Sequence, residues 1–117
     1  MKRTLAALFA ALMALATPAM AHTTLERTSP ASGSVLTESP SQLTLTFGEP
    51  TRLTSVVVAT ASGERRLDFT PSGSATTFIV AAPELAAGRN EVRWRALSRD
   101  GHPVEGSIII VIRPSSP

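Results

Sequence analysis

The sequence predicts an all-β fold, a β-sandwich or Greek-key barrel of seven strands. Three observations support this prediction. Apolar residues recur with a period of two along most of the chain, and no helical stripe of useful length appears. Gly, Pro and Ser separate the apolar runs about every 8–12 residues, which is typical of sandwiches and barrels. The chain has 117 residues, enough for one domain and too few for two.

Residues 1–21 have the features of a secretory signal peptide. A Lys-Arg pair lies near the start, an apolar run follows, and Ala-Met-Ala supplies the small residues that a signal peptidase reads. A membrane anchor is the alternative, but an apolar run of about a dozen residues is shorter than the roughly 20 that cross a bilayer. We therefore expect cleavage after Ala21, export, and a single domain at 22–117 that begins with His22.

The first four strands are predicted in the N-terminal half of this domain. Leu25, within 22–28, indicates an edge strand. Residues 43–47 alternate Leu, Leu and Phe with Thr, which is typical of a half-buried strand. Residues 55–60 form a β-branched run around three valines, and the Ala-Ser-Gly that follows turns the chain into a short strand at 66–69.

Three more strands are predicted in the C-terminal half. A Pro-Ser-Gly-Ser loop leads to a strand at 77–80, and a short helical turn is expected at 82–87. Residues 90–97 alternate Val, Trp and Ala with polar or charged residues, and 107–112 is the last and most hydrophobic strand. The aromatic residues at predicted core positions are Phe47, Phe69, Phe78 and Trp94.

Composition excludes several classes of function. Residues 22–117 contain nine arginines and nine acidic residues, so no excess of cations is present to neutralise nucleic-acid phosphates. The chain has no cysteine, which excludes disulfide scaffolds, iron–sulfur clusters, thiolate metal sites and thiol enzymes. No second long apolar stretch occurs, so the domain is not predicted to be embedded in a membrane. Four arginines are predicted to lie on a solvated sheet face, namely Arg89, Arg93, Arg95 and Arg99.

Nitrogen and oxygen donors suitable for a metal ion occur at two places in the domain. Its two histidines are His22, the expected amino terminus, and His102, in the sequence Asp100-Gly101-His102 between two predicted strands. A terminal histidine offers both its α-amine and its imidazole. With His102 and Asp100 this makes three nitrogens and one oxygen, a set that suits tetragonal Cu(II) better than Zn(II) or Ca(II).

Each of these residues also has a simpler interpretation. A histidine at the first position can be an accident of processing. Asp-Gly is among the strongest hairpin signals, so Asp100 and Gly101 can serve turn geometry alone, and His102 can be an ordinary surface residue. The joint arrangement favours a metal site, because the only two histidines of the domain fall at its terminus and beside a carboxylate.

The sequence resembles the CopC family of periplasmic copper-binding proteins along essentially the whole of residues 22–117. The resemblance is carried by His22 directly after the leader, by Ser-Pro-Ala-Ser-Gly-Ser at 29–34, and by Pro40 leading to 43–47 with Glu49. At the other end it is carried by 98–106, Ser-Arg-Asp-Gly-His-Pro-Val-Glu-Gly, followed by an apolar strand.

The resemblance implies an immunoglobulin-like Greek-key barrel that binds copper in the periplasm, in copper homeostasis or resistance, without catalysis. It implies that His22, Asp100 and His102 are the Cu(II) ligands, with the amine of His22 completing the set. Glu49 matches an acidic position that in similar proteins lies beside the copper, so we expect it to support the ligands without binding the metal.

One departure from the family is informative. Some members carry a second, Cu(I) site rich in methionine, but residues 22–117 contain no Met, no Cys and no further His. We therefore expect one Cu(II) per chain, no Cu(I) site, and transfer of copper to a separate protein such as an inner-membrane transporter. Two alternatives stay open from the sequence: a histidine-brace copper oxidase, and a copper-free immunoglobulin-like interaction module.

Overall fold

The computed structural model describes residues 24–115, which form seven β-strands and no helix, as the all-β prediction requires. The predicted signal peptide and His22 lie outside the described residues. The strands are β1 (Leu25–Ser29), β2 (Ser34–Leu36), β3 (Gln42–Thr60), β4 (Gly63–Leu67), β5 (Ser74–Ala81), β6 (Gly88–Leu97) and β7 (Pro103–Ile112).

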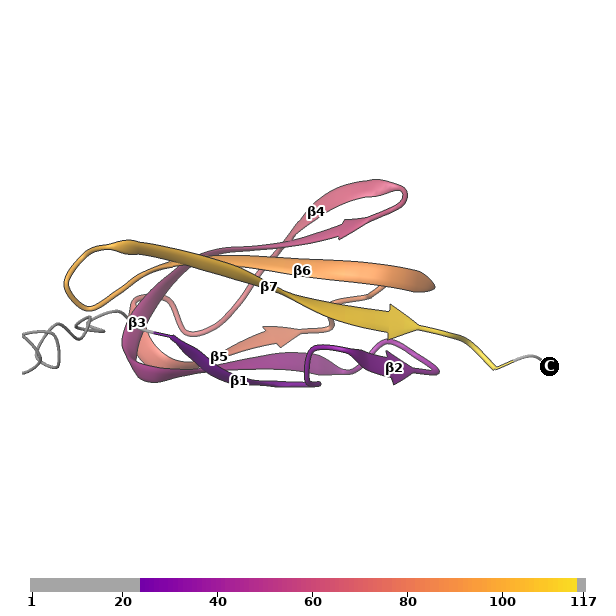
Figure 1. Cartoon of the computed structure of the whole chain (residues 1–117), viewed down its shortest axis with the longest axis horizontal. Helices are drawn as coiled ribbons and strands as arrows, with labels where there is room; N and C mark the ends of the chain where they lie inside the picture. The colour runs from indigo at the N-terminus through magenta and orange to yellow at the C-terminus, as the bar shows by residue number, and fades with distance from the viewer. Residues whose placement is uncertain (1–23, 116–117) are drawn as a thin grey trace, which may run out of the picture.

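The strands form one curled sheet that folds into two layers. Its order is β1-β3-β6-β7-β2, and β3 also pairs with β4 and β5. The first part of β3 lies in one layer with β1 and β5, and its second part lies in the other layer with β4 and β6 (Figure 1). All pairs are antiparallel except β2 and β7, which run parallel at one edge.

The bend of β3 is a correction to the prediction, which had two separate strands at 43–47 and 55–60. The Gly-Glu-Pro sequence at 48–50 interrupts the pairing with β5 but does not end the strand. A further irregularity between Leu53 and Ser55 shifts the register against β6. Thr54 is the extra residue at this irregularity. The buried positions of β3 are odd-numbered before it and even-numbered after it, a change that a regular strand with period two does not allow.

Two further differences concern short segments. β2 was not predicted, because three residues carry too little pattern; their pairing with β7 creates the strand. The helical turn expected at 82–87 is wrong. Ala82 and Glu84 have positive φ values of 46° and 50°. The buried Asn90 accepts a hydrogen bond from the Ala86 amide and donates to the Ala86 and Gly88 carbonyls, so its side chain takes the place of helical hydrogen bonds.

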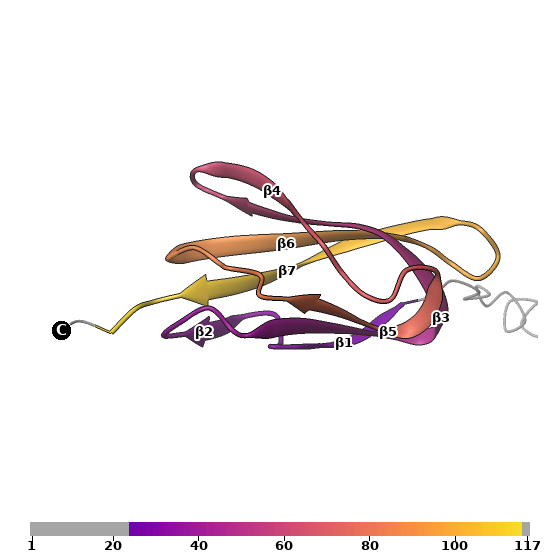
Figure 2. The same cartoon turned by 180° about the vertical axis from the view of Figure 1, so that it is seen from behind.

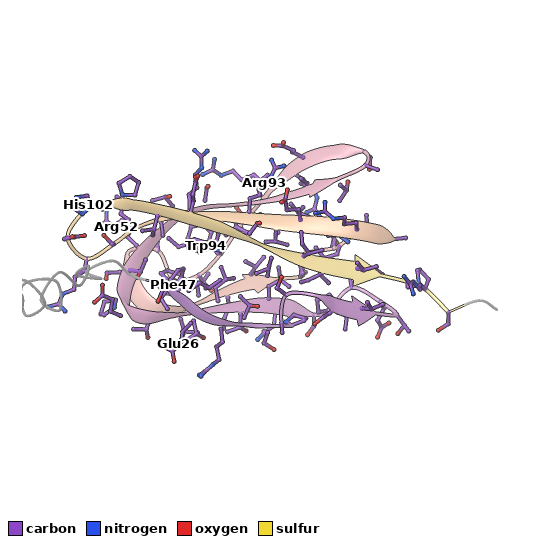
Figure 3. All side chains as sticks on the ribbon, viewed as in Figure 1. Glu26, Phe47, Arg52, Arg93, Trp94 and His102 are labelled. Carbon is purple, nitrogen blue, oxygen red and sulfur yellow. The ribbon has the colours of Figure 1, made fainter. Side chains whose placement is uncertain are left out.

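The hydrophobic core lies between the two layers. Phe47 and Trp94 meet edge to face at 5.3 Å, and Phe47 and Phe78 do so at 5.9 Å (Figure 3). Phe69 is only partly buried and packs against Phe78 from the edge of this cluster. The aromatic core prediction is therefore confirmed, with Phe69 at its margin.

The predicted solvated face is confirmed. Arg89, Arg93, Arg95 and Arg99 are all exposed. Arg93 pairs with Glu91 and Glu64, and Arg95 pairs with Glu105. Such exposed pairs are screened by solvent and contribute little stability, but they show that this face is adapted to solvent.

Candidate metal centre

The β6–β7 loop, residues 98–102, lies at the end of the sandwich where β3 bends. Figures 1 and 2 show this loop, the bend of β3 and the start of β1 at the same end of the molecule. β1 is joined to the bend directly, since the Gly48 amide donates to the Thr24 carbonyl at 3.2 Å. Segments that are distant in the sequence therefore meet around this loop.

Backbone hydrogen bonds give the loop a closed shape. The Ser98 amide donates to the His102 carbonyl at 2.8 Å, and the Gly101 amide donates to the Ser98 carbonyl at 2.9 Å. Gly101 has a φ of 87°, in the left-handed region that favours glycine. Asp100-Gly101 therefore forms the turn that the sequence indicates. The same loop also brings the side chains of Asp100 and His102 together.

The side chains of Ser98, Asp100 and His102 form one hydrogen-bonded group. The Ser98 hydroxyl donates to Oδ1 of Asp100, and Nδ1 of His102 lies 2.9 Å from Oδ2 of the same carboxylate. The His102 amide in turn donates to the Ser98 hydroxyl at 3.2 Å. Ser98 is buried, whereas Asp100 and His102 are exposed, so a buried hydroxyl positions two exposed donors.

Ser98 supports the two candidate donors, and sequence reasoning did not single it out. A serine beside an Asp-Gly turn can hydrogen-bond groups a few residues along the chain, which is the signal that points to it. The Ser98 hydroxyl, followed by the His102 ring, lowers the pKa of Asp100 from 3.8 to about 2. Asp100 is therefore ionised at any physiological pH, and its charge favours a cation at this loop.

The contact with Asp100 also selects a nitrogen of His102. An ionised carboxylate only accepts hydrogen bonds, so the proton between the two groups belongs to Nδ1 of the ring. In the neutral imidazole the lone pair is then on Nε2, as in histidine ligands that are oriented by a carboxylate. Nε2 suits Cu(II) but lies on the far side of the ring from Asp100, so the carboxylate must leave Nδ1 if both residues are to bind one ion.

The structure places the predicted site residues as follows. Asp100 and His102 are brought together. Glu49 lies half-buried in the bend of β3, at the same end of the sandwich. Its backbone carbonyl accepts a hydrogen bond from the Thr51 hydroxyl at 2.9 Å. Within residues 24–115, no three His, Cys, Asp or Glu side chains gather as a metal-binding group. The described loop thus supplies two of the predicted donors, and His22 is outside the described residues.

Residues 25–112 match the sequence profile of the CopC domain. The chain belongs to the CopC family. The match includes the bend of β3, the 98–102 loop and all seven strands of the structure, so it covers the whole sandwich. No curated protein sequence matches the chain.

Solved structures of this family share the fold. The crystal structure of CopC from Methylosinus trichosporium OB3b has a TM-score of 0.69 and 27% identity, covering 82% of this chain and 98% of that one. The structure of PcoC, a methionine-rich copper resistance protein from Escherichia coli, has a TM-score of 0.57 and 25% identity, covering 80% and 100%. In the part of the chain from 24 to 115, no helix is long and apolar enough to span a membrane.

Proposed function

We propose that this CopC-family protein binds one Cu(II) ion in the periplasm and serves copper homeostasis or resistance, without catalysing a reaction. The observation that carries the proposal is the hydrogen-bonded group of Ser98, Asp100 and His102. It holds an ionised carboxylate and an imidazole together on one loop. Both are donors that Cu(II) accepts, and the family implies copper as the cargo.

The remaining donors are proposed to come from His22. Thr24 is joined to Gly48 beside the bend of β3, at the same end as the 98–102 loop. Two residues of extended chain reach about 7 Å at most, so a ligand at position 22 is restricted to this end of the molecule. Its amine and imidazole would complete a set of three nitrogens and one oxygen, with Glu49 supporting the ligands from the bend.

The sequence also supports a proposal for the cellular location of the protein and for the oxidation state of the bound copper. Signal-peptide cleavage after Ala21 would export the protein and expose the amine of His22. All three methionines, at 1, 13 and 20, precede this point, so the exported protein has no thioether for Cu(I). It would hold Cu(II) alone and pass it to a separate protein, such as an inner-membrane transporter.

A titration of the protein that begins at His22 tests the proposal. Cu(II) binding should end at one equivalent, with a tetragonal, nitrogen-rich EPR spectrum. His102→Gln should weaken binding by more than about 100-fold, since losing a mere supporting partner already costs about 10–100-fold. Arg89→Gln, at the far end of β6, is the control and should bind normally. Saturation at two equivalents, or no saturable binding, would contradict the one-site proposal.

A further inference from the structure

A surface hollow of about 240 Å³ opens beside the 98–102 loop. Pro50 and Arg52 line it from the bend of β3, and Arg99 and Gly101 line it from the loop. Arg52 lies at a junction of three strands, because its backbone pairs with Ser74 of β5 on one side and with β6 on the other. Figure 3 shows Arg52 and His102 at the same end of the sandwich.

This hollow differs from four other surface hollows in the charged residues that line it. Four other surface hollows of the described chain contain both arginine and glutamate. Arg93 and Arg95, which line such hollows, are paired with Glu91 and Glu105. The hollow beside the loop contains two arginines and no carboxylate, so its positive charge is not neutralised by its own lining.

The nearest loop carboxylate does not serve these arginines. One oxygen of Asp100 accepts from the Ser98 hydroxyl and the other contacts the ring of His102. Within residues 24–115, neither Arg52 nor Arg99 forms an ion pair or a side-chain hydrogen bond. Two exposed arginines therefore line one hollow without an ion pair or a side-chain hydrogen bond in the described chain.

We propose that Arg52 and Arg99 bind a small oxyanion, a carboxylate or a phosphate, in the hollow beside the 98–102 loop. Guanidinium groups present a fork of N–H donors that matches two oxygens of such anions. The volume of the hollow accommodates a small dicarboxylate or inorganic phosphate. A role for this anion rests on the proposed function. The bound anion would offset the repulsion between these arginines and the incoming Cu(II), so the anion and copper would bind cooperatively.

The test is a titration of the copper-free protein with inorganic phosphate and with malonate at constant, low ionic strength. NMR should show saturable shifts at Arg52, Arg99 and Gly101, with a Kd on the order of 1 mM for two charge-assisted contacts. The anion that binds more tightly identifies the class, carboxylate or phosphate. Linear, non-saturating shifts, or shifts spread evenly over the arginines, would overturn the site.

Variants separate a specific site from general attraction. Arg52→Gln and Arg99→Gln should each weaken anion binding about ten-fold, since hydrogen bonds to charged groups are worth that much. Arg89→Gln removes the same charge at the far end of β6 and should leave the affinity unchanged. Equal weakening in all three variants would reject the proposal. Thermal unfolding checks that each variant is folded; both side chains are exposed and form no described ion pair or hydrogen bond.

Calorimetry of the same anion with the copper-loaded protein tests the coupling. The anion should bind about 5–10-fold more tightly when Cu(II) is present, at the lower end of the usual range of coupling between sites. Equal affinity with and without copper would overturn the cooperative role. Because the first titration uses no metal, anion binding by a protein that fails to bind Cu(II) would count against the proposed function alone.

Discussion

Oδ2 of Asp100 lies 2.9 Å from Nδ1 of His102, within a loop of five residues. Ser98 holds this pair in place. Its hydroxyl contacts the carboxylate and accepts a hydrogen bond from the His102 amide. Orientation of an imidazole by a carboxylate is the arrangement that tunes histidine ligands in metal sites. The loop therefore holds its two donors in a defined relation through contacts of its own.

The first prediction concerns the acidity of Asp100. Its pKa is lowered to about 2, first by the Ser98 hydroxyl and then by the His102 ring. A carboxyl pKa that is lower in the folded state stabilises the fold above the ordinary value of 3.8, and this contribution is lost as the pH falls toward about 2. NMR titration of the carboxyl carbon should give a midpoint of about 2.

Ser98→Ala should raise the Asp100 midpoint toward 3.8, because the largest cause of the shift is removed. Thr37→Ala, an exposed change just beyond β2, is the control and should leave the midpoint in place. If the midpoint were unchanged in Ser98→Ala, the Ser98 hydroxyl would not be the group that acidifies Asp100.

The second prediction concerns the amino terminus. A protein that retains Ala21 should bind Cu(II) at least about ten-fold more weakly than one that begins at His22, because the amine becomes an amide, which is a poor donor until it loses a proton. Competition with a chelator of known affinity measures the difference. Equal affinities in the two proteins would remove the amine of His22 from the proposed ligand set.

The third prediction concerns copper oxidation state. The protein beginning at His22 should not compete with a Cu(I)-specific chelator, since it has no methionine or cysteine. Reduction by ascorbate should accordingly release the bound copper to that chelator. Retention of Cu(I) after reduction would contradict the Cu(II)-only proposal.

The fourth prediction concerns the core. Gly106 lies opposite Trp94 in the β6–β7 ladder, and a Cβ at Gly106 would lie 2.8 Å from Cζ2 of the indole. Gly106→Ala should therefore force the ring to move and lower the free energy of unfolding by about 1–3 kcal/mol, the usual cost of overpacking. Denaturant unfolding, followed by the fluorescence of this single tryptophan, measures the loss. An unchanged stability would show that the indole adjusts freely.

Local patterns of the sequence were sufficient for much of the fold. The alternation at 43–47 and 90–97 predicts strands whose buried faces carry Phe47 and Trp94, and the structure confirms both. Asp100-Gly101 predicts the turn at 98–102, because its residues suit that backbone. These features depend on neighbours in the chain, so period and turn chemistry reveal them.

Long-range pairing was decided only in the tertiary structure. The pairing of β3 with four strands makes one bent strand of two predicted ones, and the parallel contact with β7 creates β2 from three residues. Alternation shows which side of a strand is buried, but it does not show which strand lies beside it.

The candidate site also combines features that the sequence determines with features that only the tertiary structure decides. The sequence by itself determined its chemistry, because Asp100 and His102 are donors that any fold would carry. The tertiary structure decided that Thr24 lies against Gly48 at the same end, and that Arg52 shares a hollow with Arg99. The physical reason is that these contacts join β1, β3 and the β6–β7 loop, and only burial of the common core brings those segments to one end of the sandwich.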